Sequence, residues 1–430
     1  MPAKLALLGG RPVRSRPFTR WPIFDERERA ELDDVLRSGS WGGFPSPNRK
    51  AREFAARFTS FQGLRFAIPT SSGTTALEVA LKALGIGAGD EVIVPAITFC
   101  ATAYAAVACM ARPIFADVRA DSVCIDPDSV SRLITPRTRA IVPVHYGATV
   151  ADLDALIAIA RPRSIAIVED CAHVPGAQWR GRGVGGWGAL GCFSFQSSKP
   201  MTAGEGGLIT TNDPELEKRC QSLINCGRRR PGEGFEMPLL GANYRMTEWQ
   251  CAVLLAQLER MPHQIELKRA MAERLRAALG RIRGIIPLVP DARVTRPVIY
   301  AFLFRIDPEV LGVSRNRFLR ALQAEGILCG IGNEPVYRSA LFPLDAPAYR
   351  RACEAAGAGA GAADEFQCPV AERLFGHELV AIAHECLLGG AGDLDEIIAA
   401  VEKVAANSSE LASAKIDRAA LEVSPARAPS

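Results

Sequence analysis

The sequence around Lys199 and Asp170 predicts a reactive amine and a reactive carboxylate, each at the end of a buried strand. Lys199 is the single lysine of a polar turn that separates the apolar run FSF from the Gly-rich segment AGEGG. Its amine can attack a carbonyl carbon and form an imine. Asp170 ends the run SIAIVED, and open α/β sheets present ligand groups at the carboxyl ends of such strands. Taken alone, Lys199 could also be solvated surface, and Asp170 could cap the following turn.

The segment TSSGTTALEVAL (70–81) predicts a place for an anionic group. Its small hydroxyl residues and glycine precede an amphipathic pattern, so free backbone N–H groups and the positive end of a helix dipole meet there. Ser72, Gly73 and Thr74 are therefore candidate phosphate ligands, although Ser and Thr also simply cap helices.

A lysine, a buried carboxylate and a phosphate-binding helix are together what pyridoxal phosphate (PLP) requires of a protein. The lysine forms the imine, the carboxylate keeps the pyridine nitrogen protonated and the helix holds the phosphate. A flat side chain should also cover the ring. The three segments in one chain therefore indicate PLP as the cofactor.

Two other motif types fail on their context. Residues 183–188 read GVGGWG and match GxGxxG, but polar QWRGR precedes them where a strand should be, which argues against a nicotinamide oxidoreductase. The twelve cysteines include no CxxC pair and no His/Cys spacing of a metal site. We therefore expect no metal, no disulfide framework and a reducing, cytoplasmic location.

Composition and charge exclude further classes. The 430 residues are 48% hydrophobic and 23% charged, which is enough for two domains with one sizeable core. A net charge of +4 is small for this length and argues against nucleic-acid binding. The most apolar window, 101–111, is shorter than the roughly 20 residues of a membrane helix. The N-terminus has too short an apolar run for a secretory signal.

From about residue 65 to 260, short β-branched runs alternate with helical patterns. This alternation predicts an α/β domain with a mostly parallel sheet covered by helices on both sides. Strand candidates lie at 91–95, 140–147, 164–170 and 207–211, and helix candidates at 74–84 and 151–160.

The domain prediction has three parts. Residues 1–260, with an N-terminal arm, would form the large domain, and residues 261–407 a smaller α+β domain. Residues 408–430 lack apolar periodicity and are expected to be a disordered tail. Within the small domain we expect a strand at 298–306, a helix at 395–404 and a mobile Ala/Gly-rich loop at 352–366.

Helix start and stop signals are clear after the Gly-rich segment. Asp213 and Pro214 predict an N-cap and first helical residue, and Gly227 the stop. Thr247 and Gln250 form a capping box for an apolar helix expected to run to about Leu258.

Taken together, the segments resemble the DegT-type sugar and aminocyclitol aminotransferases, a branch of the fold-type I PLP-dependent transferases. The likeness runs from Trp21 to the final helix and is most specific in SSGTTAL, VPAITF, VEDCAH, FSFQSSKPMTAGEGG and GANYRMTEWQ. This resemblance implies a seven-stranded-type sheet in the large domain and the smaller C-terminal α+β domain.

The resemblance also implies roles for single residues. Lys199 would be the imine lysine and general base, and Asp170 the partner of the pyridine nitrogen. The remaining cofactor-binding positions would be His173 near the ring oxygen, Phe99 on the ring face, Ser72, Gly73, Thr74 and Ser194 at the phosphate, and Asn243 reaching the phosphate of a neighbouring subunit. The protein would therefore be a homodimer with shared active sites.

One departure shifts the expected substrate. Many nucleotide-sugar members read SFH before the lysine, whereas this chain has Gln196. The motif SFQ, with NEPVYR (333–338) and CPVAER (368–373), is more similar to the sequences of scyllo-inosose aminotransferases and 3-amino-5-hydroxybenzoate synthases. The reaction expected by resemblance moves an amino group from L-glutamate or L-glutamine, through pyridoxamine phosphate, to a ketone on a cyclitol or sugar. Tyr337 of NEPVYR is a candidate substrate contact.

Other functions remain open on the residues alone. A sugar 3-dehydratase of this fold would, by resemblance, carry His in place of Lys199. An aromatising lyase of the hydroxybenzoate synthase type would use the same lysine, and a nucleotide-sugar aminotransferase is the other alternative. A non-catalytic module would be expected to lose Lys199 or Asp170.

The loop NCGRRRPGEGFE (225–236) carries the one dense basic cluster. Arg228, Arg229 and Arg230 in a Gly/Pro loop could be plain solvated surface. They could also hold the carboxylate of the amino donor, because the loop leads into the GANYR segment and a planar guanidinium binds a carboxylate bidentately.

Overall fold

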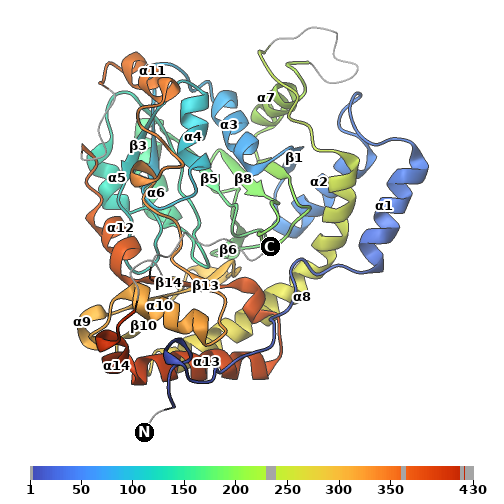
Figure 1. Cartoon of the computed structure of the whole chain (residues 1–430). Helices are drawn as coiled ribbons and strands as arrows, with labels where there is room; N and C mark the ends of the chain where they lie inside the picture. Colours follow the sequence, from blue (N-terminus) through green and yellow to red (C-terminus); the bar gives the residue numbers. More distant parts are fainter. Residues whose placement is uncertain (1–2, 229–238, 360–364, 417–420, 422–430) are drawn as a thin grey trace.

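The computed structural model describes residues 3–228, 239–359, 365–416 and 421. A seven-stranded sheet with the order β1-β9-β8-β5-β4-β2-β3 forms its centre (Figure 1). Only β9 runs against the others, because β1 and β8 both pair with it in antiparallel register while all remaining pairs are parallel. The predicted α/β fold with a mostly parallel seven-stranded sheet is confirmed. The strands are β1 (Phe66–Thr70), β2 (Glu91–Pro95), β3 (Arg112–Ala116), β4 (Thr138–Ile141), β5 (Ala166–Asp170), β8 (Leu190–Ser194) and β9 (Gly207–Thr211).

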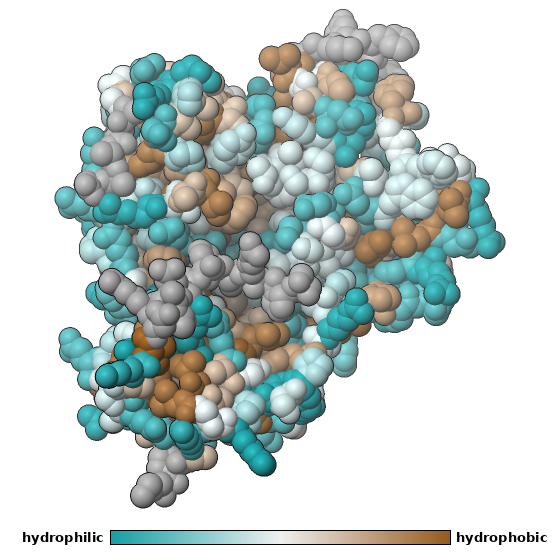
Figure 2. Space-filling model, viewed as in Figure 1, coloured by the Kyte–Doolittle hydropathy of each residue, from teal (hydrophilic) through white to brown (hydrophobic). Residues whose placement is uncertain are grey.

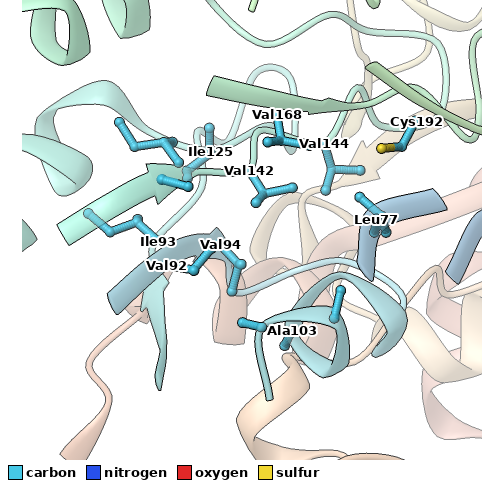
Figure 3. Close-up of a cluster of buried hydrophobic side chains, with 14 of the residues drawn as sticks. Leu77, Val92, Ile93, Val94, Ala103, Ile125, Val142, Val144, Val168 and Cys192 are labelled. Atoms are coloured by element: carbon cyan, nitrogen blue, oxygen red, sulfur yellow. The ribbon is translucent and has the colours of Figure 1, made fainter. Parts of the chain in front are cut away.

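Helices pack on the sheet because its strands are apolar on both faces. All five residues of β2 and of β8 are buried. Figure 3 shows side chains of β2, β5 and β8 in one cluster with Leu77 of α3 and Ala103 of α4. The helices of this region are α1 (Glu26–Ser38), α2 (Arg49–Gln62), α3 (Gly73–Ala83), α4 (Ala101–Ala108), α5 (Pro127–Leu133), α6 (Leu153–Ala160) and α7 (Pro214–Ile224).

The predicted helix signals are confirmed in part. Asp213 caps α7 through hydrogen bonds from the backbone of its first turn, but the helix ends at Ile224, before Gly227. Thr247 and Gln250 form the capping box of α8 (Glu248–Leu279). The expected end of this helix near Leu258 is wrong, because α8 continues through Pro262 to Leu279, about six further turns, and buries residues such as Leu275 and Leu279.

Past α8 a second, antiparallel sheet of order β10-β12-β14-β13 carries its own apolar cluster. The predicted strand at 298–306 appears as β12 and the helix at 395–404 lies within α13. The elements here are β10 (Ile285–Pro287), β12 (Ala301–Ile306), β13 (Cys329–Gly330), β14 (Leu379–Ala383), α9 (Pro308–Leu311), α10 (Arg315–Ala324), α11 (Pro347–Ala355), α12 (Pro369–Arg373), α13 (Ala391–Ala406) and α14 (Ser408–Ser413). A small third sheet holds β6 (Gln178–Trp179), β7 (Arg182–Gly183) and β11 (Val294–Arg296). Short 3-10 and π segments are η1 (Ala6–Leu8), η2 (Arg161–Arg163), η3 (Val336–Arg338), η5 (Leu374–Glu378) and η6 (His384–Leu387).

Two segments expected to lack order are partly structured. Residues 352–355 of the expected mobile loop belong to α11, and residues 360–364 lie outside the described residues. The expected tail begins with α14, whose Leu411 is fully buried in the second apolar cluster. Leu411 and Ile416 pack on this cluster, and Arg317 donates to the carbonyls of Leu411, Ala412 and Ala414. These long-range contacts order a stretch that has no apolar periodicity of its own.

The N-terminal arm packs on the second sheet's helices. Leu5 and Phe18 belong to the apolar cluster of residues 272–411. The Arg14 guanidinium, almost fully buried, pairs with Asp393 and with Glu396. The predicted boundary near residue 260 falls inside α8, and the segment 5–18 lies beside α13 of the second sheet's region (Figure 1).

No helix among the described residues is long and apolar enough to cross a membrane.

Candidate active site

Asp170 lies at the carboxyl end of β5 with a buried carboxylate. Its Oδ2 accepts a hydrogen bond from Thr102 Oγ1 at 2.9 Å, and its Oδ1 accepts one from the Ala172 backbone at 3.1 Å. Burial raises the pKa of Asp170, while these hydrogen bonds and the nearby charge of Lys199 act in the opposite direction. The carboxylate is thus held in place and lacks a tightly paired cation among the described residues.

Lys199 ends a tight turn directly after β8. The backbone N–H of Lys199 donates to the Gln196 carbonyl at 2.9 Å, and the Gln196 side-chain oxygen accepts hydrogen bonds from both the N–H and the hydroxyl of Ser198. Residues 196–199 are called the lysine turn below. The Lys199 amine lies 4.6 Å from the ring centroid of Tyr300. Gln196 therefore stabilises the turn that carries the lysine. It stands where many nucleotide-sugar members of the resembled family have His.

His173 is buried in an aromatic group next to the lysine. Its ring stacks on Tyr300 at 4.1 Å between centroids and meets Tyr146 edge-on at 5.3 Å. Its Nδ1 accepts a hydrogen bond from the Gly147 backbone, so Nε2 carries the proton. Burial, together with the positive charge of Lys199, holds the pKa of His173 well below its usual value. His173 is therefore a neutral ring with one N–H to donate.

The N-terminus of α3 forms a narrow backbone surface beside the end of β8. Ser72 caps the helix by accepting a hydrogen bond from the Thr75 N–H. A Cβ on Gly73 would lie 2.7 Å from the Cβ of Ser194, and one on Gly207 would lie 2.1 Å from the Ser72 carbonyl oxygen. Only glycine fits at these two close approaches. The structure thus brings together Ser72, Gly73 and Ser194 as predicted, with Thr74 half-buried beside them.

Phe99 and Asn243 have exposed side chains in the single chain. Phe99, with 51% of its surface accessible, stands just before α4, and its carbonyl accepts a hydrogen bond from the backbone of Thr102. It is therefore in the same turn as the residue that holds Asp170. Asn243 is bridged to Asn225 through the backbone only.

The predicted substrate contacts have other surroundings. The half-buried Arg228 places its guanidinium 5.4 Å from the ring centroid of Phe44. Arg229 and Arg230 lie outside the described residues. Tyr337 is buried, its ring packs near Phe115, and its hydroxyl donates to Glu372 at 2.9 Å. Neither Phe115 nor Glu372 is a predicted site residue.

Sequence reasoning missed the residues that reach the lysine from distant segments. Tyr300 stands in the run VIYAFLF, which reads only as a strand, yet it contacts both His173 and Lys199. Thr102 carried no motif at all. A hydroxyl one helical turn after Phe99 was the only local signal, and it gains meaning from the fold that brings α4 to the end of β5.

His145, Glu169 and Cys171 form a buried cluster with metal-ligand side chains. The Glu169 carboxylate already accepts hydrogen bonds from His145 and from the backbone of residues 185, 187 and 188. His145 uses its other nitrogen to accept from Ala151. The glycine-rich segment 183–188 therefore folds around the buried Glu169 carboxylate. Its GxGxxG pattern has a structural role here and does not form a dinucleotide-binding loop.

Residues 22–385 match the model of the DegT/DnrJ/EryC1/StrS aminotransferase family. The chain is 44% identical over 416 residues to a Streptoalloteichus tenebrarius protein provisionally assigned as an L-glutamine:3-amino-2,3-dideoxy-scyllo-inosose aminotransferase, covering 96% of this chain and all of that one. It is 40% identical to the L-glutamine:2-deoxy-scyllo-inosose aminotransferase of Micromonospora echinospora, over 95% of this chain and 99% of that protein.

A solved structure has the same fold. The crystal structure of 3-amino-5-hydroxybenzoic acid synthase superposes with a TM-score of 0.82 at 32% identity, covering 92% of this chain and all of that one. This match agrees with the fold-type I PLP-dependent transferase fold expected from the sequence.

Proposed function

Because the chain belongs to the DegT/DnrJ/EryC1/StrS aminotransferase family, we propose that it holds PLP at Lys199 and aminates the ketone of a cyclitol with L-glutamine as donor. The names of the relatives support L-glutamine over L-glutamate and a scyllo-inosose-type ring over a nucleotide sugar. The observation that carries the proposal is the placement of the Lys199 amine against Tyr300, whose ring stacks on the buried His173, together with the buried carboxylate of Asp170.

The residues present fit PLP. The Asp170 carboxylate is buried without a tightly paired cation among the described residues, and a protonated pyridine nitrogen is the cation that such a group stabilises. The N-terminus of α3 offers backbone donors where a side chain at Gly73 would collide with Ser194. When bound, PLP supplies an electrophilic carbon for the amino group and a ring that delocalises the electrons released at the substrate.

The chain's own groups then have separate tasks. Lys199 would hold and move protons at the reacting carbon, since its amine is the one base that the turn presents there. Asp170 would keep a proton on the ring nitrogen. His173 would donate a hydrogen bond from Nε2 to the ring oxygen of PLP. The phosphate would be bound by Ser72, Gly73, Thr74 and Ser194.

We infer a homodimer in which Asn243 acts on the site of its partner. The exposure of Asn243 supports this, and so does the nearby exposed Leu240. Further exposed apolar side chains lie on α1 and in the segment just after it: Leu36, Trp41 and Phe44. Figure 2 shows hydrophobic residues at the surface around α1 and α2, at the right of that view. A cytoplasmic location is part of the proposal, and the twelve free cysteines support it.

A substrate screen tests the function. The purified enzyme is incubated with L-glutamine labelled with nitrogen-15 at the α-amine and with one ketone at a time. The ketones are 2-deoxy-scyllo-inosose, its 3-amino-2,3-dideoxy relative, scyllo-inosose and a nucleotide 4-keto sugar. Mass spectrometry should find a labelled amino-cyclitol. Labelled product only from the nucleotide sugar would replace the acceptor class, and release of water with an aromatic product would favour the lyase.

A further inference from the structure

Two ring N–H groups hold the backbone of the lysine turn. Trp21 Nε1 donates to the carbonyl of Ser197 at 2.9 Å. The His384 Nε2 lies 3.2 Å from the carbonyl oxygen of Ser198. Because a carbonyl oxygen only accepts, Nε2 of His384 must carry the proton. The two carbonyls immediately before Lys199 are thus bound by two side chains from outside the central sheet.

The two rings also support each other. Trp21 and His384 meet edge-to-face, with 4.6 Å between centroids and 82° between planes. Tyr300 stands 6.1 Å from His384, and its hydroxyl lies 3.3 Å from the hydroxyl of Ser198. His384 is 2% exposed, so its ring has a fixed orientation. Aromatic pairs of this geometry limit the rotation of both side chains.

Trp21 and His384 come from parts of the chain that are distant from Lys199 in sequence. Trp21 precedes α1, and the Ile23 carbonyl two residues on is fixed by a hydrogen bond from Gln257 of α8. His384 begins η6 directly after β14 of the second sheet. The lysine turn itself follows β8 of the first sheet, so three separate elements meet at residues 197 and 198.

We propose that Trp21 and His384 are positioning residues, which fix the Ser197 and Ser198 carbonyls and thereby set the place of the Lys199 amine. This rests on the proposed function, in which Lys199 is the reacting amine. The hydrogen bonds of both residues go to the backbone of the turn and not to the Lys199 amine. A turn of four residues with one polar face in solvent would otherwise sample several conformations, and an amine displaced by about 1 Å can lose much of its reactivity.

At neutral pH the His384 ring is an uncharged donor. Burial, with the nearby Lys268, holds the pKa of His384 well below its usual value. The His384 Nδ1 and the Lys268 amine have no hydrogen-bond partner among the described residues. The ring therefore remains neutral with its single proton on Nε2, directed at Ser198.

Matched substitutions separate the hydrogen bond from simple packing. His384→Met removes the donor and keeps much of the volume, whereas His384→Gln keeps an N–H near the position of Nε2. Trp21→Phe keeps a flat ring and removes the donor. The exposed His377 and the half-buried Trp187, which donates to the Arg182 carbonyl, give the controls His377→Met and Trp187→Phe.

Hydrogen exchange of the purified protein tests the positioning without any cofactor. We expect the peptide that spans residues 195–203 to exchange about 5- to 10-fold faster in His384→Met and Trp21→Phe, which is the size of one neutral hydrogen bond. His384→Gln should restore most of the protection, and the controls should match the wild type. Equal exchange in all five variants and the wild type, at unchanged melting temperature, would overturn the proposal.

The second readout is the reaction of Lys199 itself. PLP is added to the apoprotein, samples are reduced with borohydride over time and the adduct on Lys199 is measured by mass spectrometry. The rate should fall about 5- to 10-fold in His384→Met and recover in His384→Gln, with kcat lowered and the KM for L-glutamine changed less than about 2-fold. A raised KM with a normal trapping rate would instead make these residues substrate contacts. Absence of an adduct in the wild type would refute the proposed function, while the exchange result would still decide the positioning role.

Discussion

The hydroxyl of Thr102 donates a hydrogen bond of 2.9 Å to Oδ2 of Asp170. This contact joins the first turn of α4 to the carboxyl end of β5. With the Ala172 N–H on the other oxygen, it fixes the plane of the carboxylate before any ligand is bound. The Asp170 carboxylate is therefore already oriented when the chain has folded. Such preorganisation is what an active site needs.

Asp170→Asn should fold normally and lose kcat on the order of 10³-fold, because a neutral amide cannot keep a proton on a ring nitrogen. Steady-state kinetics and the melting temperature measure this. Thr102→Val should give a smaller loss, since it frees the carboxylate without removing its charge. Asp213→Asn keeps the N-cap of α7 and is the control. Near-normal turnover of Asp170→Asn would make the residue purely structural.

The purified protein should absorb at roughly 410–430 nm, and borohydride should attach the cofactor to Lys199. Peptide mapping by mass spectrometry locates the adduct. Lys199→Arg should show no reduced adduct although the phosphate site is intact. The fully buried Lys268 should stay unmodified in both proteins. An adduct on another lysine would refute the assignment.

Mixing Lys199→Ala with Asn243→Ala subunits should restore about a quarter of the wild-type activity, because half of randomly paired dimers are hybrids with one intact site. Activity is measured after subunit exchange, which native mass spectrometry verifies. The matched control mixes Lys199→Ala with Asp170→Asn. If both residues act on the site of their own chain, that mixture should stay inactive. No recovery in the first mixture would place Asn243 outside the partner's site.

Arg228→Lys should raise the KM for L-glutamine by roughly 10-fold, equivalent to about 1.4 kcal/mol, if its guanidinium binds the donor carboxylate. Arg229→Lys and Arg230→Lys test the other two members of the cluster. Arg29→Lys on the exposed face of α1 is the control. Unchanged donor kinetics in all three loop variants would make the cluster surface charge.

Lys268→Met should stabilise the protein at neutral pH. Burial lowers the pKa of Lys268 to about 7 from the ordinary 10.5, so between these values the unfolded chain binds a proton that the folded chain does not. Stability attributable to this residue therefore rises with pH across that window, and the penalty is complete below pH 7. We expect the free energy of unfolding at pH 7 to rise by roughly 2–4 kcal/mol.

Denaturant unfolding at fixed protein concentration, at pH 7 and pH 10, measures this gain. The difference between Lys268→Met and the wild type should shrink at the higher pH. The exposed Lys218→Met gives the control. A destabilised Lys268→Met would mean that the amine is bound by a group such as the neighbouring Glu385, whose own pKa burial raises.

Local patterns predicted the parts of the site that lie within one strand, turn or helix end. Asp170, Lys199 and the α3 N-terminus were readable because each needs only a strand edge or a cap. Tyr300 and His384 could not be predicted, because each reaches the lysine turn through a contact that spans 100 or more residues of chain. The same holds for the end of α8, where tertiary packing outweighs the cost of Pro262. It also holds for α14, which is held by the burial of Leu411 and by hydrogen bonds from the distant Arg317.

The packing of the N-terminal arm against α13 has a consequence for the order of synthesis. Arg14 pairs with Asp393 and Glu396, and the Glu325 carboxylate binds both the arm and Lys403. The segment with Ala6 and Arg14 is therefore synthesised more than 300 residues before its partners Glu325, Asp393 and Glu396. The central sheet can assemble during translation before the surroundings of the lysine turn, which are complete only once residue 384 has left the ribosome. A nascent chain stalled before residue 380 should accordingly carry a lysine without its His384 support.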